Sequence, residues 1–489
     1  MKGKAAGARS DVSAGLRRMA EHNARMADKP PRNVVADIWQ AAGLPVAALQ
    51  QLSLTGADPV LPSSFAVGTA AQSTIAAAAL AACELGHARG APRQGVAVDM
   101  AHAALECTGW FSVDGQVPEQ WDPISGLYRC ADGHVRIHAN FAHHREGALR
   151  LLGLDPTTAT RADAEAALMQ WQALDFETAA AERSLVVSAL RSFAQWDATP
   201  QGQALAGQPL FSVERIGEEA PPLALPPLPA DQRPLCGLRV LDLTRVLAGP
   251  VGGKALAAYG ADVMLLNSPS LPNITAIADT SRGKLSAHVD LRTAEGAATL
   301  RQLVGDAHVF VQGYRPGGLA QMGFGPEALA SMRPGIVAVS LTAYGTQGPW
   351  ALRRGFDSLV QTATGFNVAE GMAFGHADRP RALPMQILDE ATGYLIAFGA
   401  AAALWRQQRE GGSWHVQVSL AQTGRWLRGL GRVAVDANEK KPDIAPFLDT
   451  SASGFGELRA LRHSAQLSRT PAAWTRPSMP PGTHPPRWP

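Results

Sequence analysis

The chain has 489 residues, which is long enough to bury a substantial core and to hold two to four domains. Lysine and arginine total 44 and aspartate and glutamate 42, so the formal net charge of +2 does not indicate binding to nucleic acid or to an anionic membrane. Hydrophobic residues make up 46% and charged residues 18%, which is typical of a globular protein. The four cysteines form no C-x-x-C pair, which argues against a zinc ribbon, a thioredoxin motif or a disulfide scaffold.

The N-terminus lacks the pattern of a signal peptide, although its basic character could mimic a transit peptide. Residues 1–33 are basic and lack the apolar core of a signal peptide, so we expect a disordered arm with a short amphipathic helix over residues 13–26. The longest apolar stretches, residues 75–83 and 394–405, are shorter than the roughly 18 residues that a membrane span needs. A cytoplasmic protein without a membrane partner is therefore expected.

The part of the chain before residue 237 is predicted to hold three regions. Residues 34–109 are expected to form a helix–strand unit that packs on the large domain, and residues 110–200 a small α+β domain. Residues 201–236 contain a Pro-rich stretch and are predicted to be an extended linker. The predicted elements are a buried Ala-rich helix over residues 70–86, a strand over 95–100 and a hairpin over 127–140 that turns at Asp132-Gly133.

From residue 237 onward, short apolar runs alternate with helical patterns. The predicted strands are 238–243, 262–266, 286–291, 308–312, 336–341 and 414–419, and the predicted helices include 252–259, 294–304 and 389–409. This alternation predicts an α/β fold over residues 237–435, a Rossmann-like parallel sheet with helices on both faces. Residues 436–489 end in a Pro-rich run and are expected to lie extended over a surface.

The chain contains a weak internal repeat. Residues 71–101 and 391–421 both consist of an Ala-rich helix, a basic polar loop and a short strand, "GVAVDMA" against "HVQVSLA". Two unrelated helix–strand units are the alternative, because most of the identities are alanine. In this register Asp389 aligns with Thr69, so a carboxylate is present in the second copy alone.

Two segments of the predicted large domain could contact an anion. The Gly-rich turn at Ala248-Gly249-Pro250 opens a helix, where free backbone N–H groups suit either a phosphate or a tight structural turn. Arg282 and Lys284 precede a strand, which suits either a nucleotide phosphate or solvated cations. Tyr314 and Arg315 follow a predicted parallel strand, where the ligand crevice of such a sheet lies.

Asp389 begins an apolar helix. It could cap that helix or act as a nucleophile, and the two interpretations are compatible because a helix N-terminus favours an ionised carboxylate. No Ser-His-Asp order, H-E-x-x-H motif or other metal-ligand spacing is present. The pair His143-His144 is interpreted as a surface pair.

Several of these segments together resemble a known family. Residues 237–430 resemble the large domain of family III CoA-transferases, the formyl-CoA transferase and carnitine CoA-transferase group, in "GLRVLDLTRVLAGP", "YRPGGLAQMGFG", "VSLTAYGTQGP", "GFDSLVQTATG" and "LDEATGYLIAFGAAAAL". Residues 66–235 are similar to the later half of that family, including "GLYRCADGHVRIHANF". The chain therefore resembles a tandem or permuted member with two partial copies.

The resemblance implies an enzyme that moves CoA between an acyl-CoA and a carboxylic acid through an aspartyl intermediate. It implies that Asp389 is the acylated carboxylate, with Asp357 as a second polar residue of the site. It implies no permanently bound cofactor and no metal, with coenzyme A and acyl-CoA as substrates. The residues expected to contact CoA are Val246, Ala248, Lys284, Tyr314 and Arg354.

The sequence departs from that family at several positions. Leu247 stands where some members carry glutamine, Gly313 replaces an asparagine, Gln321 an arginine and Asn267 an acidic residue.

The family also contains α-methylacyl-CoA racemases, which need a histidine where this chain has Phe356. A racemase is therefore an alternative, as is a non-catalytic CoA-binding protein. Related enzymes form interlocked dimers, and because this chain holds parts of two copies, a monomer and a homodimer are both compatible with it.

Overall fold

The computed structural model describes residues 29–435 and 441–489. The helix expected over residues 13–26 lies outside the described residues. The first described helix, α2 (Pro31–Ala41), begins with proline, a residue that the first helical position favours because its missing N–H has no partner there. Helix α2 therefore starts inside the arm assigned to residues 1–33, and its apolar side is buried at Val34 and Val35.

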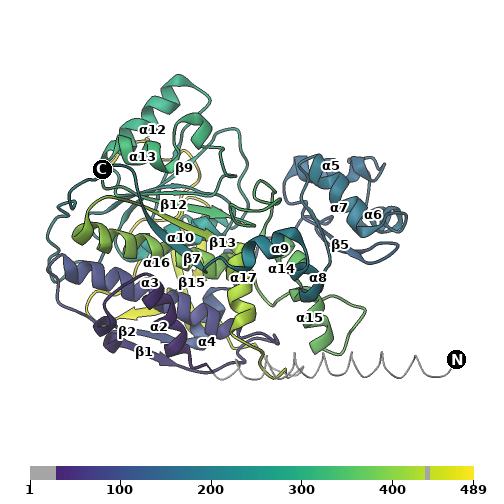
Figure 1. Cartoon of the computed structure of the whole chain (residues 1–489), viewed down its shortest axis with the longest axis horizontal. Coiled ribbons are helices and arrows are strands. Elements are labelled where there is room, and N and C mark those ends of the chain that lie inside the picture. Colours follow the sequence, from purple (N-terminus) through teal and green to yellow (C-terminus); the bar gives the residue numbers. More distant parts are fainter. Residues whose placement is uncertain (1–28, 436–440) are drawn as a thin grey trace.

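A seven-stranded sheet forms the centre of the molecule, in the order β10-β9-β8-β11-β12-β13-β7 (Figure 1). Neighbouring strands run parallel except β7, which is antiparallel to β13 at one edge. The strands are β7 (Phe211–Ile216), β8 (Arg239–Leu243), β9 (Asp262–Asn267), β10 (Leu285–His288), β11 (Val309–Gln312), β12 (Val337–Thr342) and β13 (Ser413–Ser419). The predicted α/β fold with a mainly parallel sheet is confirmed.

Strand β7 was not predicted, because it lies in the segment assigned to a linker, residues 201–236. Its residue Val213 pairs with Val416 of β13, and a short helix, α9 (Pro200–Ala206), precedes it. Only Phe211 of its six residues is buried, so the strand gives no apolar run in the sequence. The linker prediction is therefore wrong for its first half, which belongs to the large domain.

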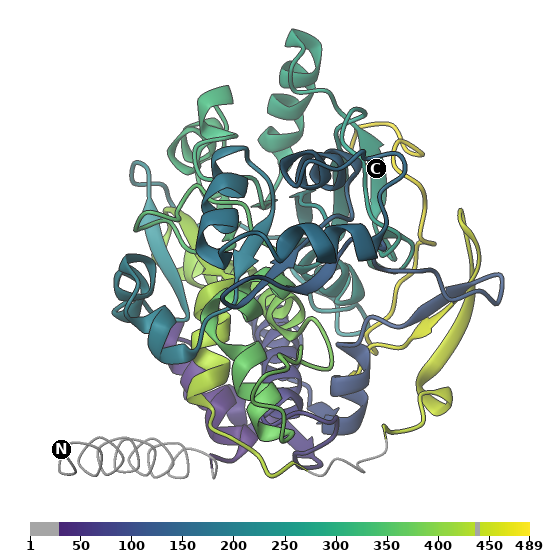
Figure 2. The ribbon, with the colours of Figure 1, turned by 90° about the vertical axis from the view of Figure 1, so that its right-hand side faces the viewer.

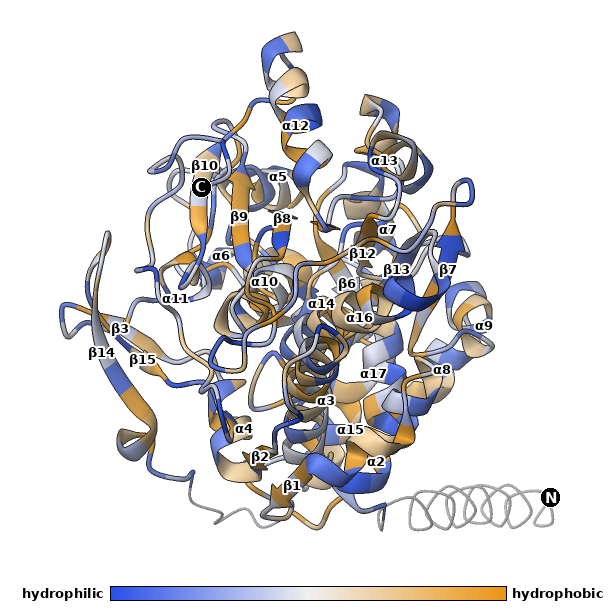
Figure 3. Cartoon of the chain, turned by 90° about the vertical axis from the view of Figure 1, so that its left-hand side faces the viewer, coloured by the Kyte–Doolittle hydropathy of each residue, from blue (hydrophilic) through white to orange (hydrophobic). Residues whose placement is uncertain are grey.

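Helices cover both faces of the sheet, as the alternating pattern predicts. The helices of the large domain are α10 (Ala248–Ala258), α11 (Ile277–Thr280), α12 (Ala294–Asp306), α13 (Pro326–Met332), α14 (Asp357–Thr364), α15 (Phe366–Ala373), α16 (Ile387–Glu410) and α17 (Leu420–Gly429). Successive residues of β8 enter different cores, since Val240 packs with the α10 and α16 side and Leu241 with the α12 and α13 side. In Figure 3, β9 is hydrophobic along most of its length, whereas the outer helix α12 carries several hydrophilic segments.

Helix α16 is the core helix of the large domain. It packs against α10 and against α3 (Val67–Ala88), and small residues allow the close approach. A Cβ added to Gly393 would lie 2.6 Å from the carbonyl oxygen of Ala248, so glycine is required where α16 crosses α10. By length and composition α16 is the one described helix that could cross a membrane, and its apolar window is entirely buried inside the protein.

The N-terminal unit contains α3 and a separate small sheet. In that sheet β2 (Val96–Asp99) pairs with β1 (Leu52–Thr55) and with the C-terminal strand β16 (Ala465–Leu467). A 3₁₀ turn over Val46–Gln51 precedes β1, and helix α4 (Met100–Glu106) follows β2. The order α3, β2, α4 matches the order α16, β13, α17, which agrees with the internal repeat.

The small domain projects from one side of the molecule in Figure 1. Its sheet contains β4 (Gly126–Arg129), β5 (His134–Ile137) and β6 (Val187–Ala189), and its helices are α5 (Ala142–Leu151), α6 (Arg161–Leu168) and α7 (Ala173–Glu182). Strands β4 and β5 form the predicted hairpin. Strand β3 (Phe111–Val113) does not belong to this domain, although it was assigned to it, because it pairs with β15 (Gly456–Leu461). A short helix, α8 (Phe193–Asp197), leads back to the large domain.

The C-terminal segment contains more structure than its proline content indicates. Strands β14 (Leu448–Ser453) and β15 form a hairpin, the yellow ribbon that stands away from the body in Figure 2. After β16 the chain has neither helix nor strand and lies across the large domain. Trp474 donates its indole N–H to the carbonyl of Lys254, and Trp488 donates to Leu303. The extended tail is therefore present, but it follows a hairpin that was not predicted.

Candidate active site

The carboxyl ends of the central strands create a crevice. Strand β8 lies between β9 and β11, so the connections leave β8 and β11 in opposite directions and the sheet has its switch point there. The loops after these two strands line a cavity of about 400 Å³, with residues 245–248 on one side and residues 313–316 on the other. Open parallel sheets bind ligands at such a point.

Asp389 lies in the first turn of α16 and reaches this cavity. Its side chain is 7% exposed, and within the described part of the chain its carboxyl group makes no hydrogen bond. The backbone N–H of Asp389 donates to Oδ2 of Asp357 over 3.0 Å. Asp357 therefore accepts a hydrogen bond from one of the free backbone N–H groups at the start of α16, and the interpretation of Asp389 as the helix cap is wrong.

The first internal copy repeats this arrangement without the second carboxylate. At the start of α3 the backbone N–H groups of Gly68 and Thr69 donate to the carboxylate of Asp58, over 3.0 and 2.8 Å. Thr69 occupies the register position of Asp389, and its hydroxyl also donates to Asp58. The first copy thus presents no free carboxyl group at the corresponding helix start.

Burial dominates the electrostatics of the acidic residues. Burial raises the pKa of Asp389 well above its ordinary value, and the negative charges of Asp357 and Glu390 raise it further. Burial also raises the pKa of Asp357 to about 6, although hydrogen bonds from Asp389 and Gln361 oppose this. Burial thus opposes the effect of the helix N-terminus, which favours the ionised form of Asp389.

Asp389 also lines a second, smaller cavity of about 80 Å³. Its walls come from the loop after α4, from residues 274–276, from the N-terminal ends of α14 and α16, and from the small domain. The small domain contributes Trp121 and His138, and the ring of His138 stacks on Phe356 with 4.1 Å between centroids. Asp389, Phe356, Val246 and Leu247 line both cavities, so the carboxyl group lies where the two meet.

The larger cavity is rich in arginine. The residues that line it include Arg245, Arg315, Arg353 and Arg354, of which Arg353 also pairs with Glu177 of the small domain over 3.3 Å. Arg354 is held by a 2.8 Å hydrogen bond between its Nη1 and Nε2 of His144. Guanidinium groups bind phosphate and carboxylate through paired N–H donors, so this cavity suits a multiply anionic ligand.

Four of the five residues expected to contact CoA line the larger cavity: Val246, Ala248, Tyr314 and Arg354. Val246 has φ of 77°, a strained conformation for a β-branched residue, as occurs where a loop is shaped for a ligand. Lys284 is the exception. It is fully buried, and its ammonium group donates to Oδ2 of Asp242 and to the carbonyl of Pro250, each over 2.8 Å. The prediction of Lys284 as a phosphate ligand is wrong, because its ammonium group is bonded to these two buried oxygens and lies outside the lining of the cavity.

Asp357 is also displaced from its predicted role. It is fully buried and lines neither cavity, so it holds Asp389 in position and does not face a ligand. Gln361 donates to its other oxygen, Oδ1, over 2.5 Å. Among the departures from the family, Leu247 and Gly313 line the larger cavity, whereas Asn267 accepts a hydrogen bond from Asn273.

The sequence did not identify Glu390, His138 and His144 as site residues. His144 is buried and bonded to Arg354, which corrects its assignment to a surface pair. Burial lowers the pKa of His144 to about 3, as do the neighbouring His143 and Arg354. The two histidines lie in the small domain, more than two hundred residues from Asp389, so no local pattern could place them at the site.

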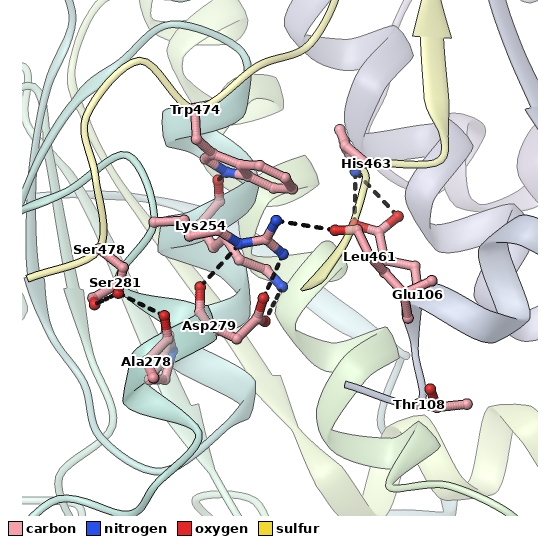
Figure 4. A network of polar contacts seen from close by, with 12 residues as sticks. Glu106, Thr108, Lys254, Ala278, Asp279, Ser281, Leu461, His463, Trp474 and Ser478 are labelled. Atoms are coloured by element: carbon pink, nitrogen blue, oxygen red, sulfur yellow. Dashed lines mark hydrogen bonds and ion pairs between the residues drawn. The ribbon is translucent and has the colours of Figure 1, made fainter. Parts of the chain in front are cut away.

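A buried ionic network lies beside the smaller cavity and fixes the C-terminal segment (Figure 4). His463 bonds to Glu106 over 2.9 Å, and Lys254 donates to Asp279 over 2.6 Å. Burial alone would raise the pKa of Glu106, but the charge and hydrogen bond of His463, with Lys254 and Ser464, hold it below its ordinary value. The network joins α4, α10 and α11 to the segment after β15.

Comparison with known proteins finds similarity to CoA-transferases. Residues 235–443 match the model of CoA-transferase family III. An acyl-CoA transferase of Gibberella moniliformis is 32% identical over 377 residues, which cover 69% of this chain and 66% of that protein. A succinate–glutarate CoA-transferase of Agrobacterium fabrum is 32% identical over 257 residues, 47% of this chain and 63% of that protein. The crystal structure of Rv3272 from M. tuberculosis, orthorhombic form, has 32% identity and a TM-score of 0.36 over 40% of this chain and 58% of that chain.

The chain thus spans about two thirds or less of the length of these relatives. The family match covers the strands β8 to β13 and the start of α16, which together form the crevice and carry Asp389. The chain is a member of CoA-transferase family III.

Proposed function

We propose that the protein transfers CoA between an acyl-CoA thioester and a carboxylic acid, with Asp389 as the nucleophile. The observation that carries this proposal is the position of the Asp389 carboxyl group, free of hydrogen bonds within the described residues, where an arginine-rich cavity and a small closed cavity meet. A thioester bound across that junction has its CoA part in the larger cavity and its acyl part in the smaller one.

The proposed cycle uses acyl exchange alone. An oxygen of Asp389 attacks the thioester carbonyl carbon, the C–S bond breaks, and CoA leaves as a thiolate from an aspartyl mixed anhydride. The thiolate then attacks the aspartyl carbonyl carbon and releases the first carboxylic acid, which leaves an aspartyl-CoA thioester. An acceptor carboxylate reverses these two steps, and the Asp389 carboxylate is regenerated.

The residues of the larger cavity have separate roles in this proposal. Arg354 and Arg315 pair with phosphate groups of CoA, and the ring of Tyr314 lies against its adenine or its pantetheine arm. The attack needs the ionised form of Asp389, which burial disfavours by raising the pKa of its carboxyl group. Asp357 acts as a positioning residue through its bond to the backbone of Asp389.

A racemase is the less favoured function. Proton exchange at the α-carbon needs a base on each side, and Phe356 cannot exchange a proton. A non-catalytic CoA-binding protein would bind CoA without forming an acyl-enzyme.

The test is to trap the covalent intermediate. The protein is incubated with a panel of acyl-CoAs and hydroxylamine, and its peptides are mapped by mass spectrometry. A hydroxamate at Asp389, absent from Asp389→Asn, is the expected result. Full transfer activity in Asp389→Ala would end the proposal. Loss of α-deuterium from a 2-methylacyl-CoA without a hydroxamate would favour the racemase, and CoA binding without either change would favour the non-catalytic protein.

A further inference from the structure

The smaller cavity has an unusual surplus of polar groups without partners. Within the described residues, neither Oγ of Ser358 nor Nδ1 of His138 has a hydrogen-bond partner, and both side chains are buried. The carboxyl group of Glu390 is also buried, and no hydrogen bond involves it in the described part of the chain. Buried polar groups are costly unless they are bonded, so three such groups in one cavity call for a ligand that bonds to them.

The charge of the lining indicates what kind of oxygen that ligand carries. Asp389 and Glu390 both face the cavity, and the described residues that line it include neither lysine nor arginine. A second carboxylate on the acyl group would therefore be buried beside Asp389 without a cation to pair with it. An uncharged oxygen does not carry this cost, since a hydroxyl group can donate and accept hydrogen bonds and a carbonyl oxygen can accept them.

Glu390 can serve as a donor in this cavity. Burial raises its pKa well above the ordinary value, and the negative charges of Asp279, Glu106 and Asp357 add to this, while Lys254 opposes it. A carboxyl group in its protonated form, which this burial favours, donates an O–H hydrogen bond. Ser358 can also donate, and neutral His138 carries either a donor or an acceptor at Nδ1.

The volume of the cavity sets the size of the ligand. At about 80 Å³ it has about half the volume of the 150 Å³ cavity that holds benzene in an engineered protein. A chain of a few carbon atoms fits, whereas a long fatty acyl chain does not. Trp121 and the stacked pair of His138 and Phe356 close the cavity on the small-domain side.

We infer that the smaller cavity selects short acyl groups that carry an uncharged oxygen substituent, with Glu390 and Ser358 as the specificity-determining residues. This inference rests on the proposed function, because it assigns the acyl part of the thioester to this cavity. It concerns residues that the chemistry of Asp389 does not itself require.

The test compares three four-carbon thioesters: butyryl-CoA, 3-hydroxybutyryl-CoA and succinyl-CoA. We expect kcat/KM for 3-hydroxybutyryl-CoA to exceed the other two by at least about tenfold, since sites built to bond a substrate oxygen reject analogues lacking it by up to about 10⁵-fold. Glu390→Met should reduce the preference over butyryl-CoA about tenfold, while Glu390→Gln, which keeps a donor of the same shape, should stay within about threefold of the wild type. Glu295→Gln, on the exposed start of α12, is the matched control and should change nothing.

The inference is overturned if the wild type uses butyryl-CoA or succinyl-CoA as well as the hydroxylated thioester, or if Glu390→Met lowers all three rates equally. Should Glu390→Met fail to fold, Ser358→Ala is measured instead and should reduce the same preference. Failure of the proposed function is distinguishable, because it shows as no acyl-enzyme with any thioester. Binding of the same three thioesters to Asp389→Ala, by calorimetry, still measures the acyl preference in that case.

Discussion

The buried pair of Lys284 and Asp242 separates two roles for Lys284: the contact with CoA that the sequence resemblance implies and the ion pair that the structure shows. Both side chains are fully buried, with 2.8 Å between Nζ and Oδ2. Lys284→Met removes the ammonium group and leaves the charge of Asp242 buried, bonded on its other oxygen to Thr244 alone. Breaking a buried pair by removing one partner costs about 3–5 kcal/mol.

The substitution should therefore lower the free energy of unfolding and leave the affinity for the substrate unchanged. At about 2 °C for each kcal/mol in a large domain, the melting temperature of Lys284→Met should fall by about 6–10 °C. The double variant Asp242→Leu/Lys284→Met should recover most of this loss, because replacing both partners removes the unpaired charge. Differential scanning calorimetry measures the melting temperatures, and steady-state kinetics of the folded protein should show a KM for acyl-CoA within about twofold of the wild type. An unchanged melting temperature together with a tenfold higher KM would refute this reasoning and return Lys284 to the CoA site.

Two further predictions concern Asp357 and the crossing of α10 and α16. Burial raises the pKa of Asp357 from 3.8 to about 6, so the folded state binds this proton more tightly than the unfolded state. Protonated Asp357 therefore adds up to about 3 kcal/mol to the free energy of unfolding below pH 4, and this contribution is lost as the pH rises past 6. Asp357→Asn should flatten this part of the stability profile in urea titrations between pH 4 and 8, and an unchanged slope would contradict the assignment. Gly393→Ala places a Cβ 2.6 Å from the carbonyl oxygen of Ala248 and should cost about 1–3 kcal/mol, whereas the control Gly305→Ala, which meets nothing within 4 Å, should be neutral or stabilising by about 0.5–1 kcal/mol. Equal urea midpoints for the two glycine variants would show that the crossing is not tightly packed.

The strands of the large domain could be predicted because each is a short apolar run bounded by turn residues. Strands β8, β9 and β12 are buried on both faces, and β9 accordingly contains the continuous apolar run from Val263 to Leu266. Strand β7 was missed because only Phe211 of its six residues is buried, and strand β3 because it has only three residues. Their partners, β13 and β15, lie about two hundred and more than three hundred residues away.

The site likewise contains residues that the sequence predicted correctly and residues whose roles it did not predict. Tyr314 was predicted at the end of a parallel strand, where such a sheet binds ligands, and Val246 and Ala248 were expected at the site from the resemblance to the family; all three line the larger cavity. The roles of Lys284 and Asp357 could not be read from the chain. Whether a charged side chain faces a cavity or a buried partner depends on which oppositely charged or N–H group lies within bonding distance.

The sequence by itself determined the α/β class and the parallel sheet, because apolar periodicity is a property of neighbouring residues, and its resemblance to a known family pointed to Asp389 as the candidate nucleophile. Only the tertiary structure decided that Asp389 lies between two cavities, that Asp357 caps its helix, and that Glu390 and His138 line the smaller cavity. Those relations join α14, α16 and the small domain across more than two hundred residues. Burial, which sets the pKa of each carboxyl group, exists only once these elements pack together.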